Sequence, residues 1–362
     1  MEVGFWAPLP PEPTGVAEYA ARLLEALARL GRICPNARRA DVLLYHLGNN
    51  QLHRQIYLEA LRRPGAVVLH DAVLHHFFLG WLDRRGYIEE FVYNYGEWAR
   101  ELAGELWENR SRSAQDPRYF RYPMLRRIAE SSLAVLVHNP AAARMVREHC
   151  PAARVIEIPF PAWRPMPAPQ WEIIRWRQAV GLGERTTLFG VFGHLRESKR
   201  LPAVLRAFRQ LRQAGAPAAL LVAGRFGSAE LERALQPLME GVIRAGYLPE
   251  REFWKLAMAA DVCVNLRYPA AGETSGINMT FMGAGKTVVL SASEETSRLP
   301  EDVCLRVEPG LGEQATLAAY MFWLASDREA VREIGRRAAA YVDRRHRLEQ
   351  VARLYWEVLT SL

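Results

Sequence analysis

The stretch Gly272-Glu273-Thr274-Ser275-Gly276-Ile277-Asn278-Met279 decides the fold. It follows a strand-like run at 261–266 (DVCVNL) and precedes a small-residue helix and a second strand-like run at 285–291 (GKTVVLS). A carboxylate and several small residues therefore stand where a strand ends and a helix begins, which is where ligands bind in an open α/β sheet. Free N–H groups at a helix start can hold an anion, and Glu273 can accept hydrogen bonds from hydroxyls. The stretch predicts a site for a ligand with a phosphate and sugar hydroxyls.

Short apolar runs alternate with helical patterns on both sides of this stretch. Besides the two runs above, strands are expected at 2–6, 41–45, 66–70, 134–138, 187–192, 219–223 and 242–247. Helices are expected between them, for example at 16–30, 201–214 and 250–260. This alternation indicates parallel sheets covered by helices on both faces.

The length of 362 residues exceeds one ordinary core, so two domains are expected. The run 158–169 contains five prolines, which fix φ and remove donors, so neither a helix nor a central strand persists there. The predicted organisation is a first α/β domain (1–160), a Pro-rich linker (161–170), a second α/β domain (171–345) and a C-terminal helix (346–362), with a return of that helix to the first domain as one interpretation. Two such domains can direct their strand ends toward one interdomain cleft.

Composition narrows the class of protein. The net charge is +7 with 50% hydrophobic and 24% charged residues, and neither zinc-ligand spacing nor RNP-like aromatic motifs occur, so no nucleic-acid partner is expected. The four cysteines are far apart, which favours free thiols in a reducing compartment. No apolar run reaches the roughly 20 residues of a spanning helix, and prolines interrupt any signal peptide. A cytoplasmic protein is expected, with peripheral contact at the inner face of the membrane as a further hypothesis.

Three other segments carry candidate chemistry. The run 193–200 (GHLRESKR) follows a strand and enters a helix, so its cations stand where a diphosphate approaches a helix start; a solvated, capped helix start explains it equally well. Thr14-Gly15 follows the first strand, and Gly15 permits close approach of a ligand. No G-x-G-x-x-G fingerprint is present, which disfavours a dinucleotide site.

His70 ends the strand that starts at Ala66, and it is a candidate for a hydroxyl contact or for proton transfer. His75 and His76 follow one turn later, but His70 and His75 lack the i, i+4 spacing of a shared helical face, so a metal site is disfavoured. No Asp-x-Asp lies at a strand end, so a metal that bridges a diphosphate is not indicated either.

A long helical insertion near 73–130 is rich in aromatic residues and arginine. It has two interpretations: amphipathic helices that pack on the domain, or a rim that contacts an acceptor or membrane headgroups. The residues concerned are Trp81, Tyr93, Tyr95, Trp98, Trp107, Tyr119, Phe120 and Tyr122, with Arg110, Arg112, Arg118, Arg121, Arg126 and Arg127.

Over essentially its whole length the chain resembles the retaining GT-B glycosyltransferases, specifically glycosyltransferase family four (group 1). In the first half the resemblance rests on Thr14-Gly15 after its Pro-rich loop, on 45–50 (YHLGNN) and on 64–71 (PGAVVLHD). In the second half it rests on 193–199, on Gly246-Tyr247-Leu248 and on the Glu273 stretch. The implied fold is GT-B: two Rossmann-like parallel α/β domains that face an interdomain cleft.

The resemblance also implies roles for individual residues. Lys199 matches the family lysine that neutralises the donor diphosphate, Glu273 matches the acid that holds donor-sugar hydroxyls, and His70 completes the catalytic set. The family's second acid, which grips the ribose, is missing: Phe281 stands at strict spacing, or Thr280 if one residue is deleted. The implied donor-binding residues are Gly15, Gly193, His194, Arg196, Lys199, Tyr247, Leu248, Glu273, Thr274, Ser275, Gly276 and Ile277.

The implied function is metal-independent, retaining transfer of a sugar from a nucleotide-sugar substrate, UDP- or GDP-linked, without a cofactor. The acceptor is expected to be a glycan, a lipid-linked or a small molecule, as in polysaccharide biosynthesis. Two alternatives stay open. One is another GT-B enzyme, such as a sugar-nucleotide epimerase or a phosphorylase; the other, suggested by the missing acid and by His194 in place of the family's arginine, is a non-catalytic nucleotide-sugar-binding subunit. The oligomeric state is not predicted.

Overall fold

The apolar runs of the first half form one parallel sheet, because strands that are buried on both faces need uncharged side chains. Its order is β2-β1-β3-β4-β5-β6, and all neighbours are parallel. The chain order reverses between β1 and β3, so the loops that follow these two strands flank a topological switch point. The strands are β1 Glu2–Trp6, β2 Arg32–Pro35, β3 Val42–Leu47, β4 Ala66–Leu69, β5 Ala134–Val137 and β6 Val155–Glu157.

The second half builds another six-stranded parallel sheet, with the order β12-β11-β10-β7-β8-β9. Read from β9, this is the 3-2-1-4-5-6 strand order of a Rossmann fold, whose switch point lies between β7 and β10. The predicted pair of Rossmann-like parallel α/β domains is confirmed. The strands are β7 Thr187–Phe192, β8 Ala218–Ala223, β9 Ile243–Ala245, β10 Val262–Asn265, β11 Thr287–Ser291 and β12 Leu305–Val307.

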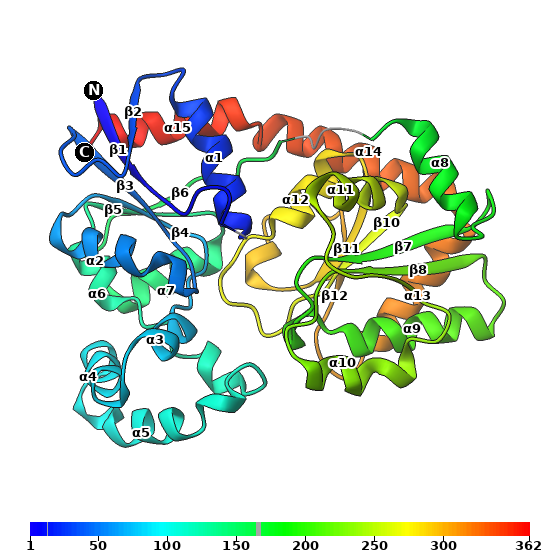
Figure 1. Cartoon of the computed structure of the whole chain (residues 1–362), viewed down its shortest axis with the longest axis horizontal. Coiled ribbons are helices and arrows are strands. Elements are labelled where there is room, and N and C mark those ends of the chain that lie inside the picture. Colours follow the sequence, from blue (N-terminus) through cyan, green and yellow to red (C-terminus); the bar gives the residue numbers. More distant parts are fainter. Residues whose placement is uncertain (13, 164–167) are drawn as a thin grey trace. The chain divides into compact units, whose positions relative to one another are not determined.

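Helices connect the strands of both sheets (Figure 1). Those of the first half are α1 Gly15–Leu27, α2 Arg54–Arg62, α3 His75–Trp81, α4 Arg84–Tyr95, α5 Arg100–Glu108, α6 Arg126–Ser131 and α7 Pro140–His149. Those of the second half are α8 Gln170–Ala179, α9 Leu201–Gln213, α10 Ala229–Leu235, α11 Glu250–Ala259, α12 Gly276–Gly283, α13 Glu313–Ser326, α14 Arg328–Arg345 and α15 Leu348–Thr360.

Local sequence explains where these helices begin and which face they bury. In α9 a proline occupies the first turn, where its missing N–H costs nothing, and Leu201, Val204, Leu205, Phe208 and Leu211 share the buried face. Asn139 caps α7 by accepting the N–H of Ala142, and Pro140 follows at the first helical position.

The computed structural model describes residues 1–12, 14–163 and 168–362, which divide into two units. The first unit comprises 1–161, 269–274 and 345–362; the second comprises 162–268 and 275–344. Residues 164–167 of the expected linker lie outside the described part. Unlike the expected second domain, the second unit does not include 269–274, because Ala271 O accepts hydrogen bonds from Ala72 N (2.8 Å) and Val73 N (3.1 Å).

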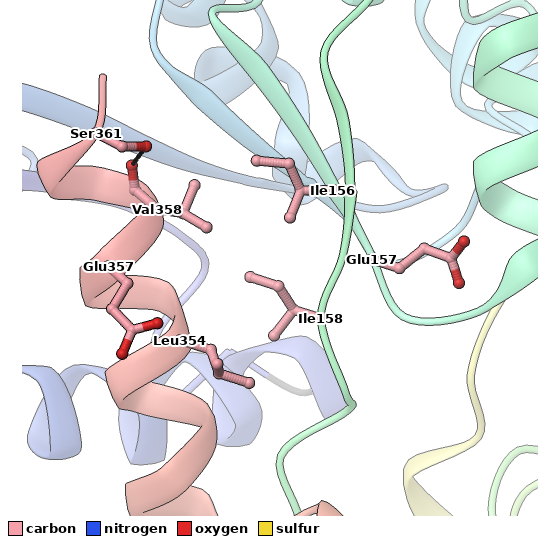
Figure 2. Close-up of a pocket in the computed structure, with 7 residues that line it drawn as sticks. All are labelled: Ile156, Glu157, Ile158, Leu354, Glu357, Val358 and Ser361. Carbon is pink, nitrogen blue, oxygen red and sulfur yellow. Dashed lines mark hydrogen bonds between the residues drawn. The ribbon is translucent and has the colours of Figure 1, made fainter.

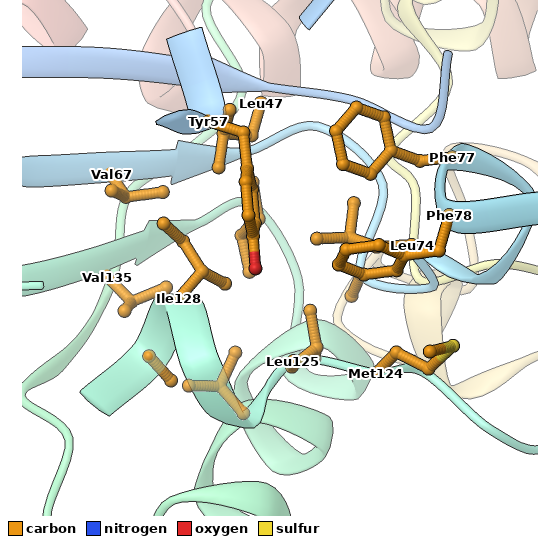
Figure 3. Packing of buried hydrophobic residues seen from close by; sticks show 14 of the residues in the cluster. Leu47, Tyr57, Val67, Leu74, Phe77, Phe78, Met124, Leu125, Ile128 and Val135 are labelled. Atoms are coloured by element: carbon orange, nitrogen blue, oxygen red, sulfur yellow. The ribbon is translucent and has the colours of Figure 1, made fainter. Parts of the chain in front are cut away.

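The first unit has an aromatic-rich core between β3, β4, β5 and the helices that cover them. In Figure 3 the ring of Tyr57 stands between strand residues such as Val67 and the rings of Phe77 and Phe78. The C-terminal helix α15 packs beside α1 (Figure 1), and the hydroxyls of Tyr19 and Tyr355 are 2.8 Å apart. In the second unit the core gathers around Phe189, Phe208 and Met321. Within the described residues, no helix is both long and apolar enough to cross a membrane.

Candidate functional site

In the second unit, Lys199 lies at the switch point of the sheet. It ends the short 3-10 helix Glu197–Lys199 that follows β7, and its side chain is buried. Its Nζ donates to Phe192 O (3.1 Å) and to Asn265 Oδ1. Because Asn265 ends β10, the neighbour of β7, this contact spans the two strands between which the chain order reverses.

The same asparagine reaches the start of α12. Asn265 Nδ2 donates to Ser275 Oγ (2.9 Å) and to Asn278 Oδ1 (2.5 Å). Ser275 caps α12 by accepting the N–H of Asn278 (3.3 Å), and Gly276 and Ile277 are the first helical residues. The structure therefore brings Lys199, Ser275 and Gly276 to one place, where free helix N–H groups and a buried ammonium favour an anion.

Glycines leave room for backbone at this edge. Gly193 has φ +92, and a Cβ on it would lie 2.8 Å from Ile277 Cδ1. A Cβ on Gly224, which follows β8, would lie 1.8 Å from Gly193 O. The loops after β7 and β8 thus approach too closely for side chains, which places main-chain atoms beside the start of α12.

Two arginines and a histidine stand at this position. His194 and Arg196 are exposed in the loop after β7, and exposed Arg225 follows β8, where its carbonyl accepts the N–H of Leu195 (2.9 Å). The pKa of His194 is lowered by partial burial and then by the charges of Arg196, Arg225 and Lys199. The hydrogen bond between Leu195 and Arg225 joins the loops after β7 and β8, so His194, Arg196 and Arg225 stand on neighbouring loops. Sequence reasoning did not identify Arg225, which carries no motif of its own.

Two further donor-binding residues implied by the resemblance, Tyr247 and Leu248, follow the next strand of the sheet. This outer strand is β9, and the Tyr247 side chain is 78% exposed. In the described part of the chain, no side-chain hydrogen bond joins Tyr247 to the other predicted residues.

The first unit holds Glu273 and Thr274. Gly272 has φ +70, and a Cβ on it would lie 2.6 Å from Ala72 Cβ, so only glycine fits where this segment meets the loop after β4. Glu273 Oε2 accepts the N–H of Ala271 (2.6 Å). This bond shapes the segment 269–274, and the hydrogen bonds from Ala72 and Val73 to Ala271 O hold the segment beside the loop that begins with His70.

Asn139 fixes the same segment from a third element. Its Nδ2 donates to Gly272 O (2.9 Å) and to Thr274 Oγ1 (3.0 Å), while its Oδ1 caps α7. Sequence reasoning missed this residue. The dipeptide Asn139-Pro140 signals a helix start. The hydrogen bond from Asn139 Nδ2 to Gly272 O, however, joins residues 133 apart in the sequence.

His70 belongs to a buried cluster in the first unit. Its Nε2 is 3.0 Å from His46 Nδ1, and its ring lies edge-on to Tyr19, whose hydroxyl is 3.0 Å from His138 Nε2. Burial lowers the pKa of His70 well below its usual value, and lowers that of His46 to about 3 and that of His138 to about 4. These rings are neutral near pH 7 and suited to hydrogen bonding.

Gly15 and the other histidines have different surroundings. Gly15 begins α1, whose cap is Thr14, at the switch point of the first sheet; a Cβ on it would meet nothing within 4 Å. The N-terminus of α1 is therefore sterically open. His75 lies in the core with its Nε2 2.7 Å from Tyr87 OH, and His76 faces the rings of Tyr119 and Phe120, so packing explains this pair.

The two positions that could replace the missing acid are buried in α12. Phe281 packs against Phe192 with ring centroids 5.1 Å apart, and Thr280 is also buried. Neither offers a carboxylate to a ribose. Among the described residues, no group of three or more His, Cys, Asp or Glu side chains is arranged to hold a metal ion.

Most aromatic residues of the helical insertion face inward. Of the eight named above, Tyr119 is buried, six are half-buried, and Trp98 is 73% exposed. Arg126 pairs with Glu130 (2.7 Å) and Arg127 with Glu90 (2.7 Å), whereas Arg112 and Arg121 are exposed. These contacts favour the packing interpretation for most of the insertion.

A small pocket lies elsewhere in the first unit, between β6 and α15 (Figure 2). It encloses about 250 Å³, has an aliphatic floor, and contains none of the predicted site residues. Its lining is Ile156, Glu157, Ile158, Leu354, Glu357, Val358 and Ser361. The volume falls below the roughly 300–1,000 Å³ of small-molecule sites.

Solved structures that are similar to this chain include GT-B glycosyltransferases, and the likeness covers the residues of both units. Sucrose-phosphate synthase from Thermosynechococcus elongatus matches with a TM-score of 0.68 at 16% identity, over 100% of this chain and 99% of that one. Anabaena HepE, solved with UDP-glucose, matches with a TM-score of 0.69 at 15% identity over 100% of both chains.

A third similar structure is WaaG, a glycosyltransferase of lipopolysaccharide biosynthesis, with a TM-score of 0.64 at 14% identity over 99% of this chain and 100% of that one. At these identities the likeness establishes the fold, and the predicted GT-B class is confirmed. No family model and no curated protein sequence matches this chain.

Proposed function

We propose that this chain is a retaining, metal-independent glycosyltransferase of family four that takes its sugar from a nucleotide-sugar donor. The observation that carries the proposal is the anion site of the second unit, where Lys199 and the capped start of α12 meet at the switch point of the sheet. The fold shared with HepE, a protein solved with UDP-glucose, supports a UDP-sugar, with a GDP-sugar next.

Each part of the second unit has a role in this proposal. Lys199 and Arg196 neutralise the diphosphate, and the neutral ring of His194 donates a hydrogen bond to it. The backbone of Gly193 and the first residues of α12 approach the phosphates closely, because no side chain intervenes. Main-chain groups at Tyr247 and Leu248 contact the base. Arg225, at the same edge, adds positive charge.

Residues of the first unit act on the sugar in this proposal. Glu273 accepts hydrogen bonds from donor-sugar hydroxyls, and the Thr274 hydroxyl donates to or accepts from them. Neutral His70 bonds to a further hydroxyl, and Gly15 leaves space for the ligand. The bond between the anomeric carbon and the diphosphate oxygen breaks with its electron pair on the diphosphate. The acceptor oxygen then bonds to the same face of that carbon, and its proton passes to the departing phosphate. The protein contributes mainly electrostatic stabilisation.

The proposed class of acceptor rests on the resemblance to the family and on the exposed residues of the helical insertion. A glycan, a lipid-linked or a small-molecule acceptor is proposed, as in polysaccharide biosynthesis on the cytoplasmic side of a membrane. Exposed Trp98, Arg112 and Arg121 of the insertion are the residues available for a peripheral membrane contact. Co-sedimentation with anionic vesicles tests that contact. If the protein shows no salt-sensitive binding to the vesicles, the membrane contact is ruled out.

A thermal-shift panel of UDP-, GDP-, ADP- and TDP-sugars tests the donor. At 100 times its Kd a ligand adds about 2.7 kcal/mol to the stability of the folded state, which gives a clear rise in Tm. We expect sugars linked to one of the four nucleotides to raise the Tm more than the others, and we expect that nucleotide to be UDP. No shift with any of the four contradicts the proposal.

One observation favours a second candidate, a non-catalytic nucleotide-sugar-binding subunit. The ribose acid is absent, and its two possible positions hold buried Phe281 and Thr280. Such a protein binds the donor but consumes none. Incubation with the stabilising donor and a panel of acceptors, followed by NMR of the anomeric proton, distinguishes such a subunit from a transferase. Conversion of the donor without an acceptor would identify an epimerase. Formation of product from a sugar phosphate would identify a phosphorylase.

A further inference from the structure

Asn265 is the polar residue of an otherwise apolar buried strand, Val262-Cys263-Val264-Asn265. A buried amide costs free energy unless its donors and acceptor are paired. Here both Nδ2 hydrogens find oxygen acceptors, Ser275 Oγ and Asn278 Oδ1, and Oδ1 accepts from Lys199 Nζ. A side chain that only filled space in this strand would be aliphatic, so the amide is retained for its hydrogen bonds.

We propose that Asn265 is a positioning residue that fixes the Lys199 ammonium against the capped start of α12 and so preorganises the anion site. The inference deepens the proposed function and rests on it for the identity of the anion, a nucleoside diphosphate. Nothing in the resemblance assigns a role to this position. The one side chain links β10, the loop after β7 and α12, so the three parts of the site are set relative to each other.

The orientation of the amide follows from its neighbours. The Lys199 ammonium can only donate, so the carbonyl oxygen of Asn265 must face it, and the N–H groups of Asn265 then face Ser275 Oγ and Asn278 Oδ1, both of which can accept. The network is consistent in this one orientation alone.

An amide also suits this role better than a carboxylate. Asn265 and the carbonyl of Phe192 hold the ammonium through neutral oxygens, so these two contacts do not cancel the charge that a diphosphate needs. A lysine side chain loses about 2 kcal/mol of rotamer entropy when it is fixed. Because the protein fixes Lys199 before the ligand arrives, the free energy of ligand binding is not reduced by this loss of entropy.

The first experiment uses Asn265→Leu, which keeps the branching at Cγ and the number of heavy atoms but removes the hydrogen bonds, and Asn265→Asp, which places a carboxylate against the ammonium. Thr287→Val is the matched control, because Thr287 is also buried and its hydroxyl bonds to Val331 O (2.6 Å) in the same unit but at the first residue of β11. Isothermal titration with UDP and with pyrophosphate measures affinity. We expect about tenfold weaker binding for the leucine variant, a larger loss for the aspartate variant, and no change for the control.

A double-mutant cycle with Lys199→Met separates positioning from general structure. If Asn265 acts through the lysine, Asn265→Leu weakens anion binding in the native background and adds less than twofold in the Lys199→Met background. Equal losses in both backgrounds overturn the inference.

A third measurement needs no ligand. The chain has lysine only at 199, 255 and 286, so protein labelled with ¹⁵N-lysine gives three side-chain ammonium positions that substitutions can assign by NMR. Asn265→Leu should shift the Lys199 signal, and Thr287→Val should not. An unchanged Lys199 signal in folded Asn265→Leu overturns the inference. If pyrophosphate shifts this signal and binds more weakly to Asn265→Leu while no nucleotide binds, the positioning role stands and the proposed donor fails.

Discussion

Glu273 divides its carboxylate between structure and the proposed chemistry. One oxygen, Oε2, accepts the N–H of Ala271 and shapes the segment 269–274. Glu273→Gln can keep that bond, because an amide oxygen still accepts, but it removes the negative charge proposed to face the sugar. We expect turnover to fall by about 100- to 1,000-fold, the scale of losing one electrostatic contact to a transition state.

Initial rates with the donor found in the thermal-shift panel measure this loss, and Glu25→Gln, at an exposed glutamate of the first unit, is the control. The Tm of Glu273→Gln should stay near that of the native protein. Native turnover in Glu273→Gln contradicts the role, whereas a large drop in Tm means that the loop contact was lost instead.

The loops after β7 and β8 depend on each other through backbone. A Cβ on Gly224 would lie 1.8 Å from Gly193 O, and backbone atoms on both sides cannot yield as a flexible side chain can. Gly224→Ala should therefore displace the loop that carries His194 and lower both stability and UDP affinity. The expected loss of stability is about 2–4 kcal/mol, because the overlap adds to the cost of φ +153.

Gly215→Ala is the matched control for that substitution. Gly215 also has positive φ, +70, but a Cβ on it would meet nothing within 4 Å. The Gly215→Ala variant should lose about 1–2 kcal/mol of stability, the cost of placing alanine in the left-handed region, and should keep native UDP affinity. Denaturant unfolding and calorimetry measure the two effects, and equal results for the two variants contradict the argument from close approach.

Elements with continuous apolar runs could be predicted from the sequence, and elements defined by their neighbours could not. The expected strands 2–6 and 187–192 coincide with β1 and β7, since both strands are almost wholly buried. The short edge strands β2, β6 and β12 were not predicted. Their side chains are partly exposed, and hydrogen bonds to one neighbouring strand rather than an apolar pattern define them.

The candidate site divides in the same way. Lys199 and the Glu273 stretch could be proposed from their places at strand ends, because that argument needs only local order. Asn265 could not, since its contact with Lys199 joins residues 66 apart and depends on β7 lying beside β10. Asn139 was missed for the same reason: the cap of α7 is local, but its bond to Gly272 O requires the fold.

Across the whole molecule the histidines are unevenly distributed, and this predicts a response to acid. Eight of the nine belong to the first unit, whereas the second contains only His194. Burial lowers the pKa of His46 to about 3, and that of His53 and His138 to about 4. Well above pH 6.5, the ordinary pKa of histidine, these rings are neutral in both the folded and the unfolded chain, so they have no effect on stability.

Below pH 6.5 the unfolded chain binds protons that the folded first unit excludes, so its stability falls as the pH falls toward about 4. Each such ring costs about 1.4 kcal/mol per pH unit. Hydrogen exchange at pH 7.5 and 5.5, corrected for intrinsic rates, should show protection lost first in peptides of the first unit. His53→Asn should reduce this pH dependence, because its amide can replace the ring Nδ1 that bonds to His46 O (2.9 Å) but does not titrate. Equal loss in both units would show that the acid response arises from carboxylates rather than from the buried histidines.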